Sequence, residues 1–181
     1  MQPFVLELLD QQWVDNKPRN VSDGCSHGRL QLVINGAHIV AEGDGEWTVS
    51  TSALRLLRTM FSDHASERGG PLILHCGMVM MASCPISVSW DVLHREGLVE
   101  IRNVIKVPTT DEATALRFAE ADTLLTLVEY GRPILQLADD VARFFSTSRP
   151  RRFTDDYERA EFESFIKEFD EKREMARALL R

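Results

Sequence analysis

Cysteine and histidine residues occur close together at two places in the sequence, in a pattern that could hold a metal ion. Cys25 and His27 are separated by one residue, and His75 and Cys76 are adjacent. Thiolate sulfur and neutral imidazole nitrogen are preferred protein ligands of zinc, and four of them complete a tetrahedral site. One hypothesis is therefore a zinc-stabilised domain that uses Cys25, His27, His75 and Cys76.

The local backbone decides whether these side chains can converge. Cys25 and His27 precede a predicted hairpin, and alternate residues of an extended chain face the same way. His75 and Cys76 would point to opposite faces of a strand, so both could bind one ion only at a bulge or turn, which Gly77 would permit. In the alternative, the histidines bond to backbone groups and all three cysteines are small core residues: Cys25, Cys76 and Cys84.

The same pairs could instead provide a thiol nucleophile. A neighbouring histidine can lower the pKa of a cysteine thiol, and Cys76 beside His75 or Cys25 near His27 would be the candidates. No oxyanion site can be placed near either pair from the sequence. A small hydrolase or transferase with an unrecognised site is therefore kept as an alternative, and no catalytic or cofactor-binding residue is assigned.

Two common enzyme signatures are missing. A phosphate-binding loop needs a glycine-rich turn that opens onto a helix. The densest glycine turn, Gly43-Asp44-Gly45, leads into a predicted strand and no lysine follows it. The paired histidines and glutamate of a helical zinc-protease motif are also absent from the sequence. No cofactor is expected apart from zinc in the hypothesis above.

The acidic composition bears on the choice of partner. The formal net charge is −7, with 21 basic and 28 acidic residues, and the pI is about 5.3. Nucleic-acid binding rests on neutralising phosphates with Lys and Arg, so no nucleic-acid partner is expected. If the surface binds a macromolecule, a basic protein is the partner that its charge favours.

The sequence also predicts the compartment. The amino terminus has no basic stretch leading into an apolar run, and no apolar stretch approaches the roughly 20 residues that span a bilayer. Three cysteines at irregular spacing do not make a disulfide framework. We therefore expect a cytoplasmic protein with reduced thiols and no membrane association.

Alternating hydrophobicity predicts an antiparallel sheet over the first two-thirds of the chain. The clearest signal is a hairpin in which Asn35-Gly36 accepts positive φ at both central positions of a type I′ turn. Short turns between strands, such as Glu96-Gly97, exclude parallel pairing. A helix over about 52–66, with Ser50 as its N-cap, is stopped by Gly69-Gly70-Pro71. The predicted strands cover residues 4–9, 30–34, 37–40, 46–49, 72–82, 86–92 and 98–107.

The chain from 109 onward is predicted to be mainly helical. Thr109 to Glu112 matches a capping box that would open a helix over about 111–120, and Thr126 with Glu129 offers a second box. Residues 122–127 fit either a last strand or a continued helix.

Two longer helices complete the prediction. Apolar residues keep helical spacing from about 130 to 145, where Pro133 would kink or delay the helix. A final helix over about 155–178 places Phe162, Phe165 and Phe169 on one face. That face either packs on the core of the protein or docks a partner.

These elements predict one α+β domain over residues 1–181. A mainly antiparallel meander, sheet-rich over 1–108 with its strands in a single layer from Leu30 to Val107, would carry helices on one face and end in C-terminal helices. Small size, acidic surface and the lack of a recognised catalytic constellation favour a non-enzymatic binding protein. A regulatory role, or one like that of a bacterial toxin-immunity protein, fits by analogy of size and charge.

Overall fold

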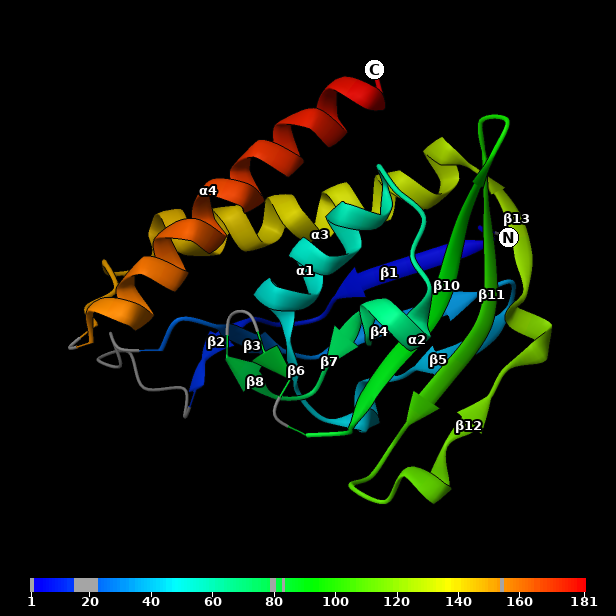
Figure 1. Ribbon diagram of the computed structural model, residues 1–181, viewed down its shortest axis with the longest axis horizontal. Coiled ribbons are helices and arrows are strands. Elements are labelled where there is room, and N and C mark those ends of the chain that lie inside the picture. The colour runs from blue at the N-terminus through cyan, green and yellow to red at the C-terminus, as the bar shows by residue number, and fades with distance from the viewer. Residues whose placement is uncertain (1, 15–22, 79–80, 83, 154) are drawn as a thin grey trace.

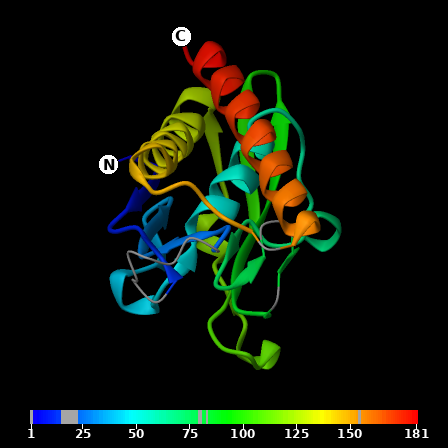
Figure 2. The same cartoon turned by 90° about the vertical axis from the view of Figure 1, so that its left-hand side faces the viewer.

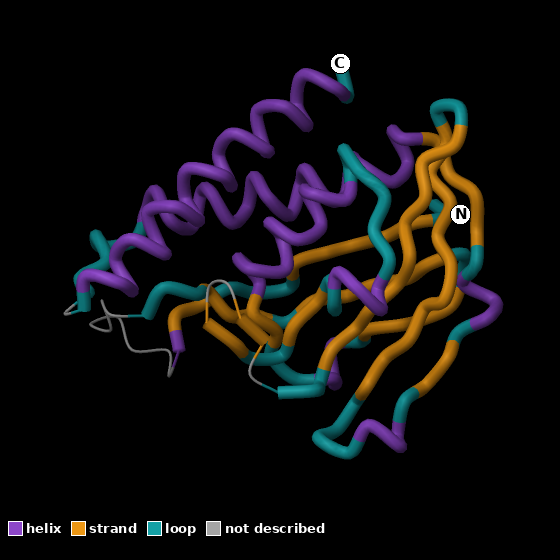
Figure 3. The backbone as a smooth tube through the Cα atoms, viewed as in Figure 1, coloured by secondary structure: helices purple, strands orange, loops and turns teal. Residues whose placement is uncertain are grey.

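The computed structural model describes residues 2–14, 23–78, 81–82, 84–153 and 155–181. Helices and antiparallel sheets are mixed, with the longest helices at the C-terminal end, so the predicted α+β class is confirmed. The helices α3 (Leu127–Thr147) and α4 (Asp156–Leu179) lie together on one side of the strands (Figures 1, 2 and 3). Within the described residues, no helix has both the length and the apolar character that crossing a bilayer requires.

The predicted hairpin over 30–40 forms most of the first sheet. β4 (Leu30–Ile34) pairs antiparallel with β5 (Ala37–Val40) and, along its other edge, with β1 (Phe4–Leu8). Asn35 and Gly36 have φ values of 50° and 84°, as the predicted type I′ turn requires. The turn between β4 and β5 therefore follows from its two central residues, whereas the pairing with β1 joins segments that are distant in the sequence.

The second sheet is built on a long hairpin. β10 (Ser87–Arg95) pairs with β11 (Leu98–Val107), and the tight turn at Glu96-Gly97 joins them as predicted. β7 (Ile73–Leu74) extends the sheet beyond β10. Two further short strands both pair with β11: β12 (Leu116–Arg117) and β13 (Thr123–Thr126).

The strands do not form one continuous layer, contrary to the expectation for Leu30–Val107. A separate small sheet contains β2 (Gln12–Trp13), β3 (Ser26–Gly28) and β6 (Trp47–Thr48). The segment 72–82 is not one interrupted strand, because after β7 the chain forms a hairpin of its own. That hairpin consists of β8 (Gly77–Met78) and β9 (Met81–Ala82). Alternation of apolar residues identifies strands but not their partners, so the sequence did not separate these sheets.

Helix α1 covers Val49–Thr59, so it begins and ends earlier than the predicted helix over 52–66. Ser50 is not the N-cap, a position that Thr48 occupies. Ser50 lies inside the helix, where its buried Oγ accepts a hydrogen bond from the Ser26 amide at 3.0 Å. The helix cannot continue to residue 66, because His64 exchanges two backbone hydrogen bonds of 2.8 Å with Val92 of β10.

A second, short helix follows this contact. α2 (Ser66–Gly69) is held to β10 by Asp91, whose Oδ1 accepts hydrogen bonds from the amide and the hydroxyl of Ser66, both at 2.8 Å. The side-chain Nδ2 of Asn103 donates a hydrogen bond to the Oδ2 of Asp91 at 2.6 Å. Partial burial opposes ionisation of Asp91, but these hydrogen bonds outweigh it and lower the pKa of the carboxyl.

The helix predicted over about 111–120 does not form, and this prediction is wrong. Two 3-10 turns, η3 (Glu112–Thr114) and η4 (Ala119–Ala121), stand on either side of β12. Pairing of β12 with β11 takes the backbone groups that a helix would have used, so tertiary context overrides the local capping signal. The segment 122–127, which fitted strand or helix, contains β13.

The second predicted capping box opens α3. The Thr126 Oγ1 accepts a hydrogen bond from the Glu129 amide at 3.2 Å, and the Glu129 carboxylate accepts one from the Thr126 amide at 2.8 Å. Pro133 lies inside this helix and does not delay its start. The last helix, α4, agrees with its predicted range, and Asp155 is its N-cap.

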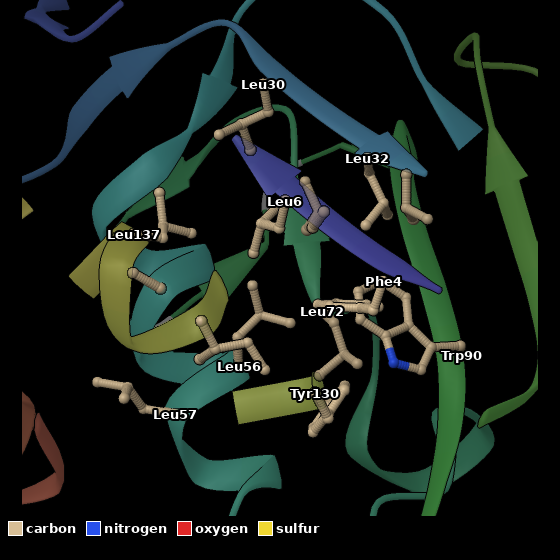
Figure 4. Close-up of a cluster of buried hydrophobic side chains, with 14 of the residues drawn as sticks. Phe4, Leu6, Leu30, Leu32, Leu56, Leu57, Leu72, Trp90, Tyr130 and Leu137 are labelled. Atoms are coloured by element: carbon tan, nitrogen blue, oxygen red, sulfur yellow. The ribbon is translucent and has the colours of Figure 1, made fainter. Parts of the chain in front are cut away.

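The core lies where α1, α3 and α4 meet the two larger sheets (Figure 4). The Tyr130 hydroxyl is buried there and lies 2.7 Å from the Thr59 hydroxyl of α1. Phe165 and Phe169 of α4 are each 1% exposed, so the aromatic face of the last helix packs on the core of the protein. Apolar side chains labelled in Figure 4 include Phe4, Leu6, Leu30, Leu32, Leu56, Leu72, Trp90 and Leu137.

Candidate metal site

His75, Cys76 and Cys84 lie at the base of the small hairpin formed by β8 and β9. His75 and Cys76 directly follow β7, and Cys84 comes two residues after β9. Within the hairpin Gly77 pairs with Ala82 in antiparallel register. This register brings the end of the hairpin back beside its beginning, so Cys84 lies next to His75 and Cys76.

The three side chains form a compact group of potential metal ligands. The Cys76 Sγ lies 2.8 Å from the Cys84 Sγ, and the Cys84 Sγ lies 3.8 Å from the His75 Nδ1. One ligand atom from each residue lies within 4.8 Å of the other two. All three side chains are partly exposed, so solvent ions have access to them. The group could therefore hold a metal ion.

Neighbouring strands fix the position of His75. Its amide donates a hydrogen bond to the Ile86 carbonyl at 3.2 Å, and its own carbonyl accepts one from the Thr48 hydroxyl at 3.3 Å. The His75 ring meets the Trp47 ring edge-on, with centroids 6.2 Å apart and planes at 82°. The histidine of the group is thus held against β6 and the residue that precedes β10, whereas the two thiols belong to the base of the hairpin.

The surroundings of Cys84 affect the ionisation of its thiol. Partial burial, and then the hydrogen bond with Cys76, raise the pKa of the Cys84 thiol. The metal-free group therefore favours the protonated thiol at Cys84. A bound cation would reverse this preference, because a coordinating thiol is deprotonated.

Cys25 and His27 do not belong to this group. The Cys25 Sγ is buried 3.7 Å from the Thr51 hydroxyl, and burial raises the pKa of its thiol to about 12. The His27 Nε2 lies 3.6 Å from the Asp23 carboxylate. Among the described residues, the cluster of metal-ligand atoms that contains His75 and Cys76 takes its third member from Cys84.

Cys84 is the ligand that the sequence interpretation missed, because it treated this residue as part of the core. The signal was present in the spacing, since eight positions separate Cys76 from Cys84. A hairpin between two cysteines brings them together, whereas the bulged strand that was predicted for this segment keeps them apart. The four residues of the zinc hypothesis are therefore divided: His75 and Cys76 lie in the group, and Cys25 and His27 lie outside it.

One further motif, the Gly-x-Ser-x-Gly pentapeptide at 24–28, matches a serine-hydrolase elbow in residue types alone. Such an elbow exposes its serine on a sharp turn from a strand into a helix. Ser26 instead begins β3 and is fully buried, and its Oγ accepts a hydrogen bond from the side-chain Nε2 of Gln11 at 2.7 Å. Gly28 is needed for packing, because a Cβ there would lie 2.0 Å from the Asp10 carbonyl oxygen. This motif therefore has a structural role.

Comparisons of the chain with protein-family models, with curated proteins and with solved structures found no match. The function is accordingly argued from the residues of the chain itself.

Proposed function

We propose that the protein binds one zinc ion through His75, Cys76 and Cys84, and that the ion fixes the base of the β8–β9 hairpin. The observation that carries this proposal is the convergence of two thiols and one imidazole within 4.8 Å. Sulfur and nitrogen donors suit zinc, whereas magnesium and calcium prefer oxygen.

The distances fit a tetrahedral zinc ion after a small adjustment. With Zn–S bonds of about 2.3 Å and a Zn–N bond of about 2.0–2.1 Å, two sulfurs lie about 3.8 Å apart and a sulfur and a nitrogen about 3.6 Å apart. The distance of 3.8 Å from the Cys84 Sγ to the His75 Nδ1 agrees with this geometry. The two sulfurs, now 2.8 Å apart, would separate by about 1 Å on binding.

We further propose that the zinc-stabilised protein acts by binding and regulating another protein. The formal net charge of −7 favours a basic partner. Three protein ligands leave one zinc coordination position for water or for a side chain of the partner. Affinity capture from the native host tests this part: a basic protein recovered in stoichiometric amount supports it, and recovery of no such partner counts against it.

The open coordination position also favours a second candidate function, a zinc hydrolase. Catalytic zinc sites keep three protein ligands and a water molecule, whose pKa the metal lowers. An activated ester such as p-nitrophenyl acetate distinguishes the two candidates. Hydrolysis by the zinc-loaded wild-type protein, above the rate of free zinc and lost in Cys84→Ser, would support the hydrolase. Equal rates of ester hydrolysis by the wild-type protein and by Cys84→Ser would count against the hydrolase and favour the binding role.

Zinc stoichiometry is the direct test of the proposed site. After reconstitution and gel filtration, we expect about one equivalent of zinc in the wild-type protein and less than about a tenth in Cys84→Ser. Cys25→Ser is the matched control, because it removes a thiol that lies outside the group. It should retain the ion. Equal loss of zinc from Cys25→Ser and Cys84→Ser would contradict the assignment of the ligands.

A further inference from the structure

A second site of a different kind lies beside α1. A polar pocket of about 80 Å³ opens between the C-terminal half of this helix, the loop after it and α2. Arg55, Arg58, Ser62 and His64 line it, together with the backbone at Gly69. Its volume is far below the roughly 300 Å³ at which pockets for drug-sized ligands begin, so it suits only a small ligand.

Arg55 is the feature that points to the charge of this ligand. It is half-buried, and its Nη1 donates hydrogen bonds to the carbonyl oxygens of Gly69 at 3.3 Å and Pro71 at 3.0 Å. In the part of the chain that the structure describes, no carboxylate forms an ion pair with this guanidinium. Burial, and then the positive charge of Arg58, lower the pKa of Arg55. A buried charge is unfavourable unless an opposite charge compensates it.

The remaining charged side chains of the lining are Arg58, which is paired, and Asp63, which has no ion pair among the described residues. Arg58 forms a bidentate ion pair with Glu168, with both nitrogen–oxygen distances at 2.7 Å. The Asp63 carboxylate lines the pocket as well, and it accepts a hydrogen bond from the His94 amide at 2.8 Å. Among the described lining residues, Arg55 is therefore the cation without an ion pair. The Asp63 carboxylate acts against an anion, but it is exposed to solvent, which screens its charge, whereas Arg55 is half-buried.

Next to Arg55, the ring of His64 packs closely against the backbone of α2. The His64 Nε2 lies 3.0 Å from the Gly70 carbonyl oxygen, and because a carbonyl only accepts, this nitrogen carries the proton. A Cβ at Gly69 would lie 2.4 Å from the His64 ring, so the glycine allows the ring to lie against the backbone. This part of the lining is thus closely packed, and the carbonyl oxygens of Gly69 and Pro71 hold the Arg55 guanidinium in place before a ligand binds.

We propose that this pocket binds one small oxyanion of the phosphate class, either as the free ion or as the phosphate group of a monoester. The Arg55 nitrogens that do not bond to Gly69 and Pro71 would donate to the phosphate oxygens, since a guanidinium fork matches their geometry. The Ser62 hydroxyl lines the same pocket and now donates a long hydrogen bond of 3.4 Å to the Arg58 carbonyl oxygen, which it would exchange for one to the anion. The anion would compensate the charge of Arg55.

Phosphate titration tests the proposal. The protein, kept in chelator so that zinc plays no part, is titrated with inorganic phosphate by calorimetry at an ionic strength held constant with sodium chloride. We expect saturable binding with a dissociation constant of about 1 mM. Arg55→Gln should weaken it by about 10- to 100-fold, because a hydrogen-bonded charge is lost. Arg68→Gln removes an exposed arginine of α2 outside the pocket and should bind phosphate like the wild-type protein.

Further measurements keep the result interpretable. Arg55→Lys keeps the charge but loses the fork, so it should fold and still bind at least about tenfold more weakly. Phenyl phosphate identifies the source: binding as tight as that of inorganic phosphate indicates a monoester, and its exclusion indicates the free ion. No saturable binding by the wild-type protein, equal binding of acetate, or an equal loss in Arg68→Gln would each overturn the proposal.

Discussion

Zinc is expected to raise the melting temperature of the wild-type protein by roughly 8–16 °C when its free concentration is about a thousand times the dissociation constant. At that ratio a ligand of the native state contributes about 4 kcal/mol, and each kcal/mol corresponds to about 2–4 °C for a chain of this size. The native hairpin holds the three ligand atoms within 4.8 Å of one another. An unfolded chain would first have to close the loop between Cys76 and Cys84, at a cost in conformational entropy. Calorimetry of zinc-loaded and chelator-treated protein measures the difference.

Two variants provide the controls for this experiment. Cys84→Ser removes one proposed ligand and should show no zinc-dependent shift. His27→Ala removes an imidazole that lies beside Asp23, outside the group, and should show the same shift as the wild-type protein. A full shift in Cys84→Ser would mean that zinc binds elsewhere. The absence of a shift in the wild-type protein would remove the basis of the proposed function.

Replacing Phe165 with alanine is expected to lower the free energy of unfolding by about 3–5 kcal/mol. The side chain is 1% exposed and lies against three other aromatic rings. The centroid distances are 5.6 Å to Phe169, 6.3 Å to Phe145 of α3 and 6.4 Å to Phe162. Its removal would leave a cavity where α4 packs on the core. Urea unfolding, followed by circular dichroism, gives the difference from the wild-type protein.

Tyr157→Ala is the matched control on the same helix. Tyr157 is 67% exposed, so its loss should change the free energy of unfolding by less than about 0.5 kcal/mol. If Phe165→Ala also cost less than about 1 kcal/mol, α4 would not be part of the core and would return as a candidate docking element.

The parts of the fold that could be predicted are those where neighbouring residues determine the backbone. Asn35-Gly36 and Glu96-Gly97 specify tight turns, and regular apolar spacing specifies α4. The prediction was wrong where contacts with residues distant in the sequence determine the backbone conformation. Strand pairing with β11 replaced the helix expected over 111–120, and a contact between His64 and β10 ended α1 early.

In the candidate site too, the local pair of residues could be predicted and the residue brought in by strand pairing could not. The adjacent pair His75 and Cys76 was visible in the sequence, but its partner depends on the register of β8 and β9. That register brings back Cys84 and not Cys25, whose thiol lies buried beside Thr51. Arg55 gave no sequence signal of its own, because its uncompensated charge follows from how α1 and α2 pack. Charge compensation is a property of the folded chain, which residue spacing does not encode.

X-ray absorption at the zinc edge tests the central claim most directly, because it reports the atoms bound to the ion. For the zinc-loaded wild-type protein we predict two sulfur ligands at about 2.3 Å, one imidazole nitrogen at about 2.0–2.1 Å and one further light atom. A spectrum with only nitrogen and oxygen ligands, or with three sulfurs, would contradict the assignment of His75, Cys76 and Cys84.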